Sequence, residues 1–326
     1  MVPRSSRLPL RRRSRSRDGA QPVTRRRPRI AVTLGDPRGV GPELVQAMLD
    51  DDALGDVCDL LVVGPRGTEV DVHEAIGTWV PGGGEALAGR IAGDAVVRAV
   101  ELAQAGAVRG IVTAPLDKHA LLLGGYDAPG HTELLAELTG RKTAMMLASE
   151  TLRVVLATTH IPLRAVAEAL TADALRDAIR LTRDGLRHWY DIAEPRIALC
   201  ALNPHAGDGG RFGTDDTDLL APVAAELGAL GPFPADTVFV RALRGEFDAV
   251  IAPYHDVGMT AIKVASFGSA VNVTLGLPFP RTSPDHGTAI DIAGQGIADS
   301  SSMRHAVLLC ARLAIHAEAM VQRASH

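Results

Sequence analysis

The feature that most limits the fold of this chain is a regular alternation, from Arg29 onward, of short apolar runs with longer stretches of helical spacing. The apolar runs are rich in Val and Ile, and each stops at a polar, Gly or Pro loop. They cover residues 30–34, 60–63, 110–113, 153–158, 197–202, 248–252 and 271–275. Stretches of helical spacing lie at residues 42–49, 85–103, 133–138, 163–170 and 173–190. Continuous apolar strands separated by helices predict an α/β fold in which a parallel sheet is covered on both faces.

The first 29 residues differ from the rest of the chain. They contain eleven arginines and one acidic residue, Asp18, and carry a charge of +10, whereas the other residues carry −14. The segment has no apolar periodicity and cannot bury enough surface to fold alone. We predict that residues 1–28 form a disordered, Arg-rich extension. A basic arm that binds an anionic partner and a wrongly chosen start codon are the alternatives.

The composition disfavours several classes of protein. Aromatic residues make up 3% of the chain, so base stacking on aromatic rings is not indicated and no nucleic-acid partner is expected. No run approaches 18 apolar residues, so no membrane span is expected. The cysteines, Cys58, Cys200 and Cys310, lie far apart in sequence. This spacing argues against a disulfide framework or a thiolate metal site and predicts a cytoplasmic location.

Three of the predicted strands are followed by a histidine, at the carboxyl ends where ligands bind in parallel α/β sheets. These residues are His160, His205 and His255. Imidazole is the commonest protein metal ligand, and three histidines with open coordination positions are typical of catalytic zinc, cobalt or nickel sites. The alternative is that each histidine caps a strand or bonds to a backbone group. Both interpretations stay open on these residues alone.

A second group of residues has the chemistry of anion binding. Residues 130–133 (GHTE) open a predicted helix, where free N–H groups and the helix dipole favour phosphate. Thr132 as a plain N-cap is the alternative. Lys263, Asn272 and Arg281 are polar residues in an otherwise apolar stretch, and lysine and arginine both bind phosphate or carboxylate. Each of them alone is also explained as a surface charge or salt-bridge partner.

A glycine-rich turn at residues 35–43 (GDPRGVGPE) follows the first predicted strand. It does not spell GxGxxG, so the standard dinucleotide-binding fingerprint is absent. Pro42 is placed as the first residue of the next helix. The segment is interpreted either as a tight strand-to-helix turn or as a ligand-facing loop.

Five long segments carry a resemblance to a known family. They are TLGDPRGVGPE, VTAPLDKHALLLGGYDAPGHTELLAELTG, LRVVLATTHIPLRAV, ALNPHAGDGGRFGTDD and APYHDVGMTAIKVASFGSAVNVTLGLPFPRTSPDHGTAIDIAGQGIAD. From about residue 29 onward the chain resembles the 4-hydroxythreonine-4-phosphate dehydrogenases of pyridoxal phosphate biosynthesis. The resemblance implies two α/β/α domains of the isocitrate and isopropylmalate dehydrogenase type, with the active-site cleft between them. Residues 29–130 plus 275–326 would form the first domain, and residues 131–274 the second.

The same resemblance implies roles for individual residues. The ligands of a divalent metal, zinc first with cobalt, nickel or magnesium as alternatives, would be His160, His205 and His255. The substrate-binding residues would be His131, Thr132, Lys263, Asn272 and Arg281. The residues beside an NAD or NADP cofactor would be His286, Gly287, Thr288 and Asp291. The candidates for proton transfer are Lys263 and Asp256. The family is a homodimer whose active sites lie at the subunit interface and draw metal ligands from both chains.

The activity implied is a metal-dependent, NAD(P)-linked oxidative decarboxylation of 4-hydroxythreonine 4-phosphate. Two departures from the family pattern lie close to the site: Val257 stands where the family has Gln, and Asp117 where Asn is common. They leave open a phosphorylated four-carbon sugar acid, 4-phospho-D-threonate or 4-phospho-D-erythronate, as the substrate. A metal hydrolase that activates water with the three histidines is the more distant alternative.

Overall fold

The computed structural model describes residues 27–266 and 268–324. The predicted disordered extension, residues 1–28, lies outside the described residues except for its last two. In the described part of the chain, no helix is both long enough and apolar enough to cross a membrane. The three cysteines form no disulfide, in line with their spacing, and all three are buried.

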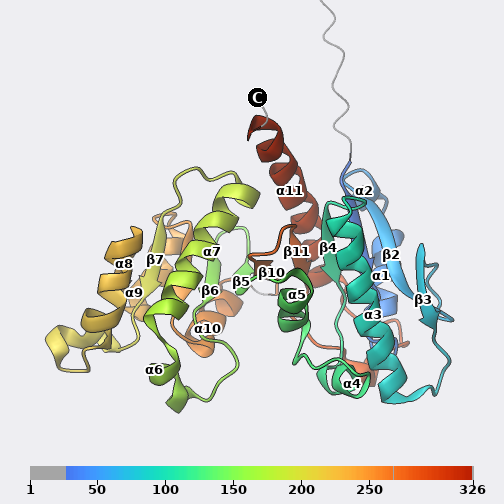
Figure 1. Ribbon diagram of the computed structural model, residues 1–326, viewed down its shortest axis with the longest axis horizontal. Helices are drawn as coiled ribbons and strands as arrows, with labels where there is room; N and C mark the ends of the chain where they lie inside the picture. Colours follow the sequence, from blue (N-terminus) through green and yellow to red (C-terminus); the bar gives the residue numbers. More distant parts are fainter. Residues whose placement is uncertain (1–26, 267, 325–326) are drawn as a thin grey trace, which may run out of the picture.

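One continuous sheet of eleven strands runs through the described part of the molecule, in the order β3-β2-β1-β4-β11-β10-β5-β6-β9-β7-β8. Figure 1 shows that this sheet joins two halves, one built around β1–β4 and the other around β5–β9. The strands are β1 (Arg29–Thr33), β2 (Asp59–Arg66), β3 (Glu74–Thr78), β4 (Gly110–Thr113), β5 (Ala144–Ala148), β6 (Arg153–Leu156), β7 (Ile197–Cys200), β8 (Leu230–Phe233), β9 (Ala249–Ala252), β10 (Val271–Leu275) and β11 (Arg281–Ser283).

The expectation of a wholly parallel sheet is wrong at its centre. The outer strands pair in parallel on both sides, but β10 runs antiparallel to β11 and to β5, and β5 runs antiparallel to β6. The cause lies in the connections, because a parallel pair needs a crossover of a dozen or more residues. Only residues 149–152 separate β5 from β6, which permits a hairpin and nothing longer.

Helices cover both faces of the sheet, as predicted. In the first half, α3 packs against one face, and α11 packs against β4, β10 and β11 on the other. In the second half, α7 packs against β5, β6, β7 and β9, while α9 and α10 pack on the opposite face. The helices are α1 (Gly41–Leu49), α2 (Asp52–Gly55), α3 (Gly84–Gln104), α4 (Lys118–Leu123), α5 (His131–Thr139), α6 (Val166–Ala169), α7 (Ala172–Tyr190), α8 (Ala221–Leu227), α9 (Ala235–Leu243), α10 (His255–Ser266) and α11 (Ser301–Ala324).

Seven strands match the apolar runs of the sequence, and four strands were missed. The missed strands are β3, β5, β8 and β11. β5 (AMMLA) contains no β-branched residue and is rich in helix formers, and β11 is a three-residue strand that begins with an arginine. Both lie at the centre of the sheet, where tertiary pairing decides the conformation.

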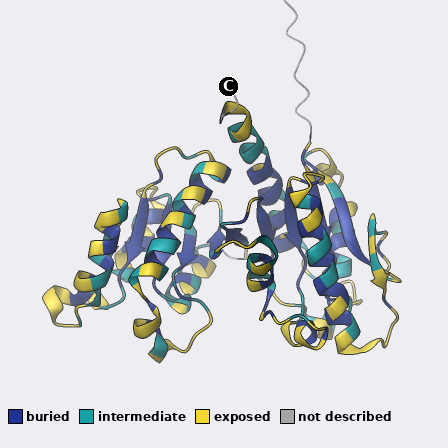
Figure 2. Ribbon diagram, in the orientation of Figure 1, coloured by how far each residue is buried: buried dark blue, intermediate teal, exposed yellow. Residues whose placement is uncertain are grey.

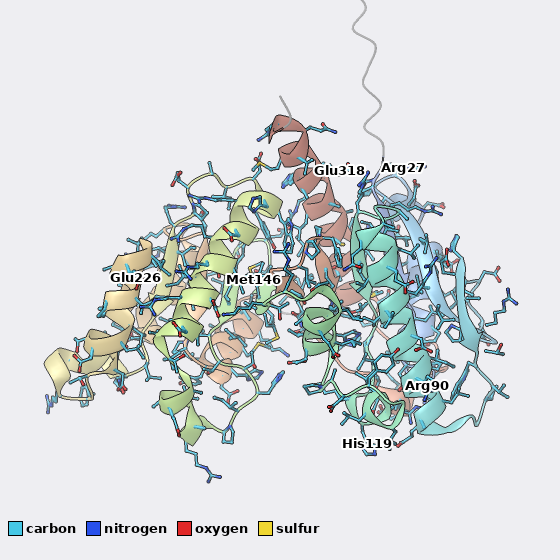
Figure 3. All side chains as sticks on the ribbon, in the orientation of Figure 1. Arg27, Arg90, His119, Met146, Glu226 and Glu318 are labelled. Carbon is cyan, nitrogen blue, oxygen red and sulfur yellow. The ribbon has the colours of Figure 1, made fainter. Side chains whose placement is uncertain are left out.

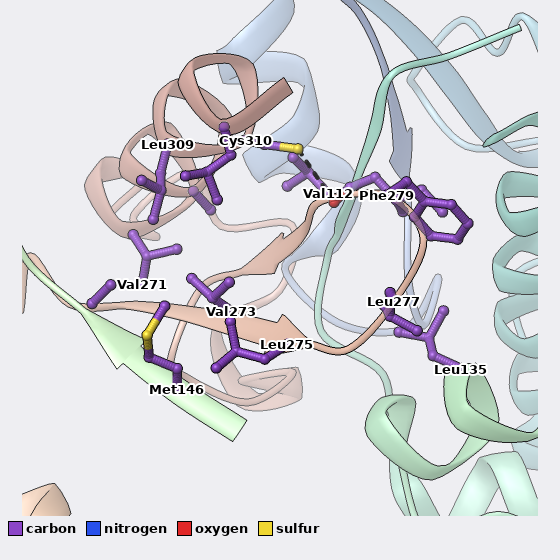
Figure 4. Close-up of a cluster of buried hydrophobic side chains, with 14 of the residues drawn as sticks. Val112, Leu135, Met146, Val271, Val273, Leu275, Leu277, Phe279, Leu309 and Cys310 are labelled. Carbon is purple, nitrogen blue, oxygen red and sulfur yellow. Dashed lines mark hydrogen bonds between the residues drawn. The ribbon is translucent and has the colours of Figure 1, made fainter. Parts of the chain in front are cut away.

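The hydrophobic core follows the sheet from one half to the other. Figure 2 shows the inner strands as buried and the outer faces of the helices as exposed. The edge strands β3 and β8 contain no buried residue. At the centre, side chains of β10 pack against Met146 of β5 and Leu309 of α11 (Figure 4). The predicted domain limits stay a prediction. α5, which begins at the predicted boundary, packs against α3 of the first half.

The position of α4 depends on a close approach to α3. A Cβ atom on Gly89 of α3 would lie 1.7 Å from the carbonyl oxygen of Ala120 in α4. Because that neighbour is backbone, α4 would have to move away. We expect Gly89→Ala to lower the free energy of unfolding by about 1–3 kcal/mol, measured by urea denaturation. Gly55→Ala is the matched control, since its Cβ would meet nothing within 4 Å. Equal stability of the two variants would contradict this account.

Candidate active site

A cavity of about 980 Å³ lies between the two halves of the sheet and brings most of the predicted site residues together. Its walls come from β4, the starts of α4 and α5, the loop after β6, α10, and the strands β10 and β11 with the loop that follows. The predicted residues that line it are His131, Thr132, His160, His255, Lys263, Asn272, Arg281, His286 and Gly287. The predicted residues that do not line it are His205, Asp256, Thr288 and Asp291.

Arg281 places a buried positive charge at the wall of this cavity. Its side chain is 1% exposed, and Nη1 donates to Oγ1 of Thr274 at 2.9 Å while Nη2 donates to Oγ1 of Thr113. Both partners are neutral hydroxyls, and Nε has no partner among the described residues. Burial lowers the pKa of Arg281 to about 10, so the guanidinium is still charged at neutral pH. The charge of Glu133 acts on Arg281 from nearby without forming a salt bridge. An anion bound in the cavity would further stabilise this buried cation.

Two more buried polar atoms at the cavity lack a partner among the described residues. They are Nε2 of His131 and Oδ1 of Asn272. Buried groups without a hydrogen bond are rare in folded proteins, and three around one cavity indicate a polar ligand. Burial, with the nearby charges of Arg281 and Lys118, holds the pKa of His131 well below its ordinary value. The imidazole is therefore neutral at neutral pH.

The start of α5 is open to the same cavity. Gly130 precedes the helix, no side chain caps it, and Gly130, His131 and Thr132 line the cavity. The sequence predicted this helix start. The free N–H groups of the first turn and the helix dipole add to the preference for an anion. Thr132 does not act as the N-cap, because it lies inside the helix.

His160 and His255 form a pair in the cavity. They follow the neighbouring strands β6 and β9, and their ring centroids lie 5.4 Å apart, tilted by 49°. Zinc binds histidine nitrogens at about 2.0–2.1 Å, and this separation leaves room for one ion between the two rings. Desolvation and the charge of Lys118 lower the pKa of His160 and favour the neutral, ligating ring.

Asp256 contacts the imidazole of His255. Its Oδ1 lies 2.6 Å from Nδ1 of His255, and its side chain is largely exposed. A carboxylate on Nδ1 leaves Nε2 of His255 for a metal, as in many carboxylate–histidine pairs. Asp256 was predicted as a proton-transfer residue, and its place beside the imidazole suits an orienting role.

His205 lies apart from this pair. It follows β7, next to β9 in the sheet, but it sits in a turn outside the cavity, 6.4 Å from the ring of Phe212. Its φ of 52° is in the left-handed region, and the same holds for the residues up to Gly210. Within residues 27–266 and 268–324, no three His, Cys, Asp or Glu side chains gather closely enough to hold a metal ion.

Lys263 and the predicted cofactor segment occupy the other side of the cavity. Nζ of Lys263 forms an ion pair with Asp285 at 3.4 Å. His286 and Gly287 follow at the cavity wall, and the chain then leaves it, because the carbonyl of Thr288 accepts from the N–H of Val40 at 2.9 Å. The segment is thereby attached to the glycine-rich turn before α1. Asp291 is exposed beyond this contact.

Several residues of the cavity were not predicted from the sequence. Lys118, Glu133, Thr113 and Asp285 all line it. The signal for Lys118 was its place directly after β4, in the class of loop that delivers ligand-binding residues. Thr113 and Asp285 act through Arg281 and Lys263, and such contacts cannot be read from sequence spacing.

Comparison with known proteins identifies close relatives. The family model of the pyridoxal phosphate biosynthetic protein PdxA matches residues 47–310. A 4-hydroxythreonine-4-phosphate dehydrogenase of Beijerinckia indica is 41% identical over 321 residues, covering 88% of this chain and 95% of the relative. A candidate D-threonate 4-phosphate dehydrogenase of Bradyrhizobium diazoefficiens is 43% identical over 339 residues, covering 89% and 98%.

A solved structure agrees with this relationship. The 4-hydroxythreonine-4-phosphate dehydrogenase of Klebsiella pneumoniae matches with a TM-score of 0.78 at 39% identity, over 88% of this chain and 99% of the other. The expected α/β fold and family resemblance are confirmed. The relatives carry two substrate names at nearly equal identity, so identity alone does not choose between them.

The lowered pKa of His131 makes a prediction about stability. The pKa of His131 is about 6.5 in the unfolded chain and lower in the folded chain. As the pH falls below about 6.5, the unfolded chain therefore takes up a proton on His131 before the folded chain does. Wild type should therefore lose up to about 1.4 kcal/mol of stability per pH unit below about pH 6.5, relative to His131→Gln. Urea denaturation at several pH values measures this. His188→Gln, on the exposed side of α7, controls for loss of a histidine elsewhere. Parallel pH profiles for wild type and His131→Gln would disprove the assignment.

Proposed function

The chain belongs to the PdxA family of NAD(P)-dependent dehydrogenases, and from that premise we propose that it oxidises and decarboxylates 4-hydroxythreonine 4-phosphate with the help of a divalent metal. The observation that carries the proposal is the buried guanidinium of Arg281, which forms no ion pair among the described residues, beside the unpartnered atoms of His131 and Asn272. This set of groups suits the anionic ends of a phosphorylated acid. The hydrolase alternative loses its basis, because the family consists of dehydrogenases.

The residues of the cavity have different proposed roles, which follow from the chemistry of their side chains. Arg281, Asn272, His131 and the start of α5 hold the anionic groups of the substrate and orient its secondary hydroxyl, which removes much of the entropic barrier. His160 and His255 would hold the metal. A metal held there would supply Lewis acidity to the hydroxyl oxygen, and a bound NAD(P)⁺ would supply the acceptor for the hydride of the carbon that bears it.

The overall reaction balances without a further reactant. The hydroxyl loses a proton and its carbon loses a hydride, which gives a β-keto acid and NAD(P)H. The carboxyl group then leaves as carbon dioxide, and the electrons of the broken C–C bond form an enolate that takes up a proton at carbon. Lys263 lines the cavity and would deliver that proton, with Asp285 holding its ammonium group in place. Asp256 remains the second candidate for proton transfer. His286, Gly287, Thr288 and Asp291 stay proposed as the cofactor-binding segment.

The metal site fits two imidazoles of one chain and needs a further ligand. We assign that ligand to His205 of a second copy in a homodimer, because His205 is exposed and turned away from the cavity of its own chain. Three imidazoles favour zinc, cobalt or nickel over magnesium. The open positions would take the substrate hydroxyl.

A phosphorylated sugar acid is the second candidate substrate, supported by the relative from Bradyrhizobium diazoefficiens. We expect 4-hydroxythreonine 4-phosphate to give the highest kcat/KM in a panel with 4-phospho-D-threonate and 4-phospho-D-erythronate. Each is assayed with NAD and with NADP, for reduced nicotinamide and for carbon dioxide. A higher kcat/KM for a sugar acid would replace the proposed substrate. No reduction with any phosphorylated acid and metal would reject the function.

The shared metal site predicts complementation between inactive variants. His160→Ala and His205→Ala should each lose activity and bound zinc. When the two are refolded together, heterodimers contain one intact site, so about a quarter of wild-type activity should return. His160→Ala mixed with His255→Ala is the control and should stay inactive, since both ligands come from the same chain. Failure of the first mixture to recover activity and zinc would rule out a ligand from the second copy.

A further inference from the structure

We propose that Lys118 is a further substrate-binding residue, which forms with Arg281, His131 and the start of α5 the corner of the cavity that takes the phosphate end of the substrate. The inference rests on the proposed function, because it takes the substrate to carry a phosphate. It also specifies how the substrate is oriented. The phosphate lies at this corner, and the reacting carbons lie near His160, His255 and Lys263.

The three fixed positive charges of the cavity differ in what they contact. Lys263 is neutralised by Asp285 at 3.4 Å. Arg281 contacts only two threonine hydroxyls. Lys118 has an exposed side chain and makes no ion pair or hydrogen bond through it among the described residues. Lys118 and Arg281 are therefore the charges left for a dianion, whereas the Lys263–Asp285 pair is close to neutral.

The backbone holds Lys118 at this place. It is the first residue of α4, whose N-cap Asp117 accepts from the N–H of Ala120 at 2.7 Å. α4 in turn packs on α3 through Gly89. Figure 3 labels the next residue, His119, at the lower edge of the first half of the molecule. The lysine stem runs from there toward α5, because Cε of Lys118 lies 3.6 Å from the point where Gly130 would carry a Cβ.

The side chain of Lys118 therefore lies beside the start of α5. Further observations support anion binding at this helix end. The first turn of α5 has no side-chain cap. Nε2 of His131 and Nε of Arg281 are buried at the same cavity without partners. The charges of Lys118 and Arg281 both lower the pKa of His131, which reflects the closeness of the three groups. A phosphate bound here would receive donors from two cations, an imidazole and backbone N–H groups.

One carboxylate opposes the anion at this corner. Oε2 of Glu133 lies 3.4 Å from the same Cβ point on Gly130, and no salt bridge to it is formed among the described residues. The negative charge of Glu133 repels phosphate, whereas the positive charge of Lys118 attracts it. The proposal therefore predicts shifts of opposite sign for these two neighbours, and loss of structure alone would not give them.

The test measures the affinity of the full chain for inorganic phosphate by calorimetry, at equal metal content in every variant. Lys118→Met should weaken binding about tenfold or more, and Lys118→Arg should retain most of it. Glu133→Gln should tighten binding. Lys142→Met is the matched control, since Lys142 is exposed outside this cavity and paired with Asp177. With the phosphorylated acid that is turned over, Lys118→Met should raise KM more than it lowers kcat.

The outcomes separate this inference from the proposed function. Unchanged phosphate affinity in Lys118→Met and Glu133→Gln, or equal weakening in Lys118→Met and Lys142→Met, would overturn the role of Lys118. If Lys118→Met fails to fold, the sign of the Glu133→Gln shift decides. Turnover of phosphorylated acids by the wild type with no effect of Lys118 leaves the proposed function standing. Absence of both phosphate binding and turnover in the wild type removes the function itself.

Discussion

The site depends on one unusual arrangement, an arginine side chain inside the central sheet. Arg281 begins β11, which pairs in parallel with β4 and antiparallel with β10. These two neighbouring strands supply the hydroxyls of Thr113 and Thr274 that receive its guanidinium. Hydroxyls satisfy hydrogen bonds without cancelling charge, so the core tolerates the arginine while its positive charge remains available to the cavity. The strand register thus fixes the position of the guanidinium in the proposed anion site.

The antiparallel centre of the sheet explains why one cavity holds both anion-binding groups and imidazoles. In an uninterrupted parallel sheet, β11 and β10 would point the same way. Here the reversal at β10 joins the first half, which presents Arg281 and the start of α5, to a second half in which β6 and β9 end at His160 and His255. The cavity lies where these two sets of strand ends meet. The Lys263–Asp285 ion pair at the wall of this cavity joins α10 to the loop after β11.

Features that depend on residues close together in the sequence were predicted correctly, whereas features that depend on contacts between distant segments were missed. Local patterns placed the start of α5, the helical stretch of α7 from residue 173 to 190, and seven of the strands, because periodic apolar positions act within a few residues of one another. Strand direction at the centre was missed, since apolar content is the same for either direction. Lys118 was missed as a site residue for a related reason. Its place after β4 indicated a ligand-binding loop, but its approach to α5 depends on the packing of α4 on α3, which the sequence spacing does not encode.

The turn that carries His205 is the most strained segment of the described backbone. Positive φ angles run without a break from His205 to Gly210, and they include three residues other than glycine. Each such residue costs on the order of 1 kcal/mol, so the conformation persists only where neighbours impose it. Asp216 anchors the chain directly before the turn: the residue is 1% exposed, and its carboxylate accepts from the N–H groups of Leu202 and Asn203 at 2.8 and 3.0 Å. The strained turn and the buried carboxylate before it leave the imidazole of His205 exposed. This arrangement adds little to the stability of one protomer. They fit a histidine that is held in place to serve the site of a second copy.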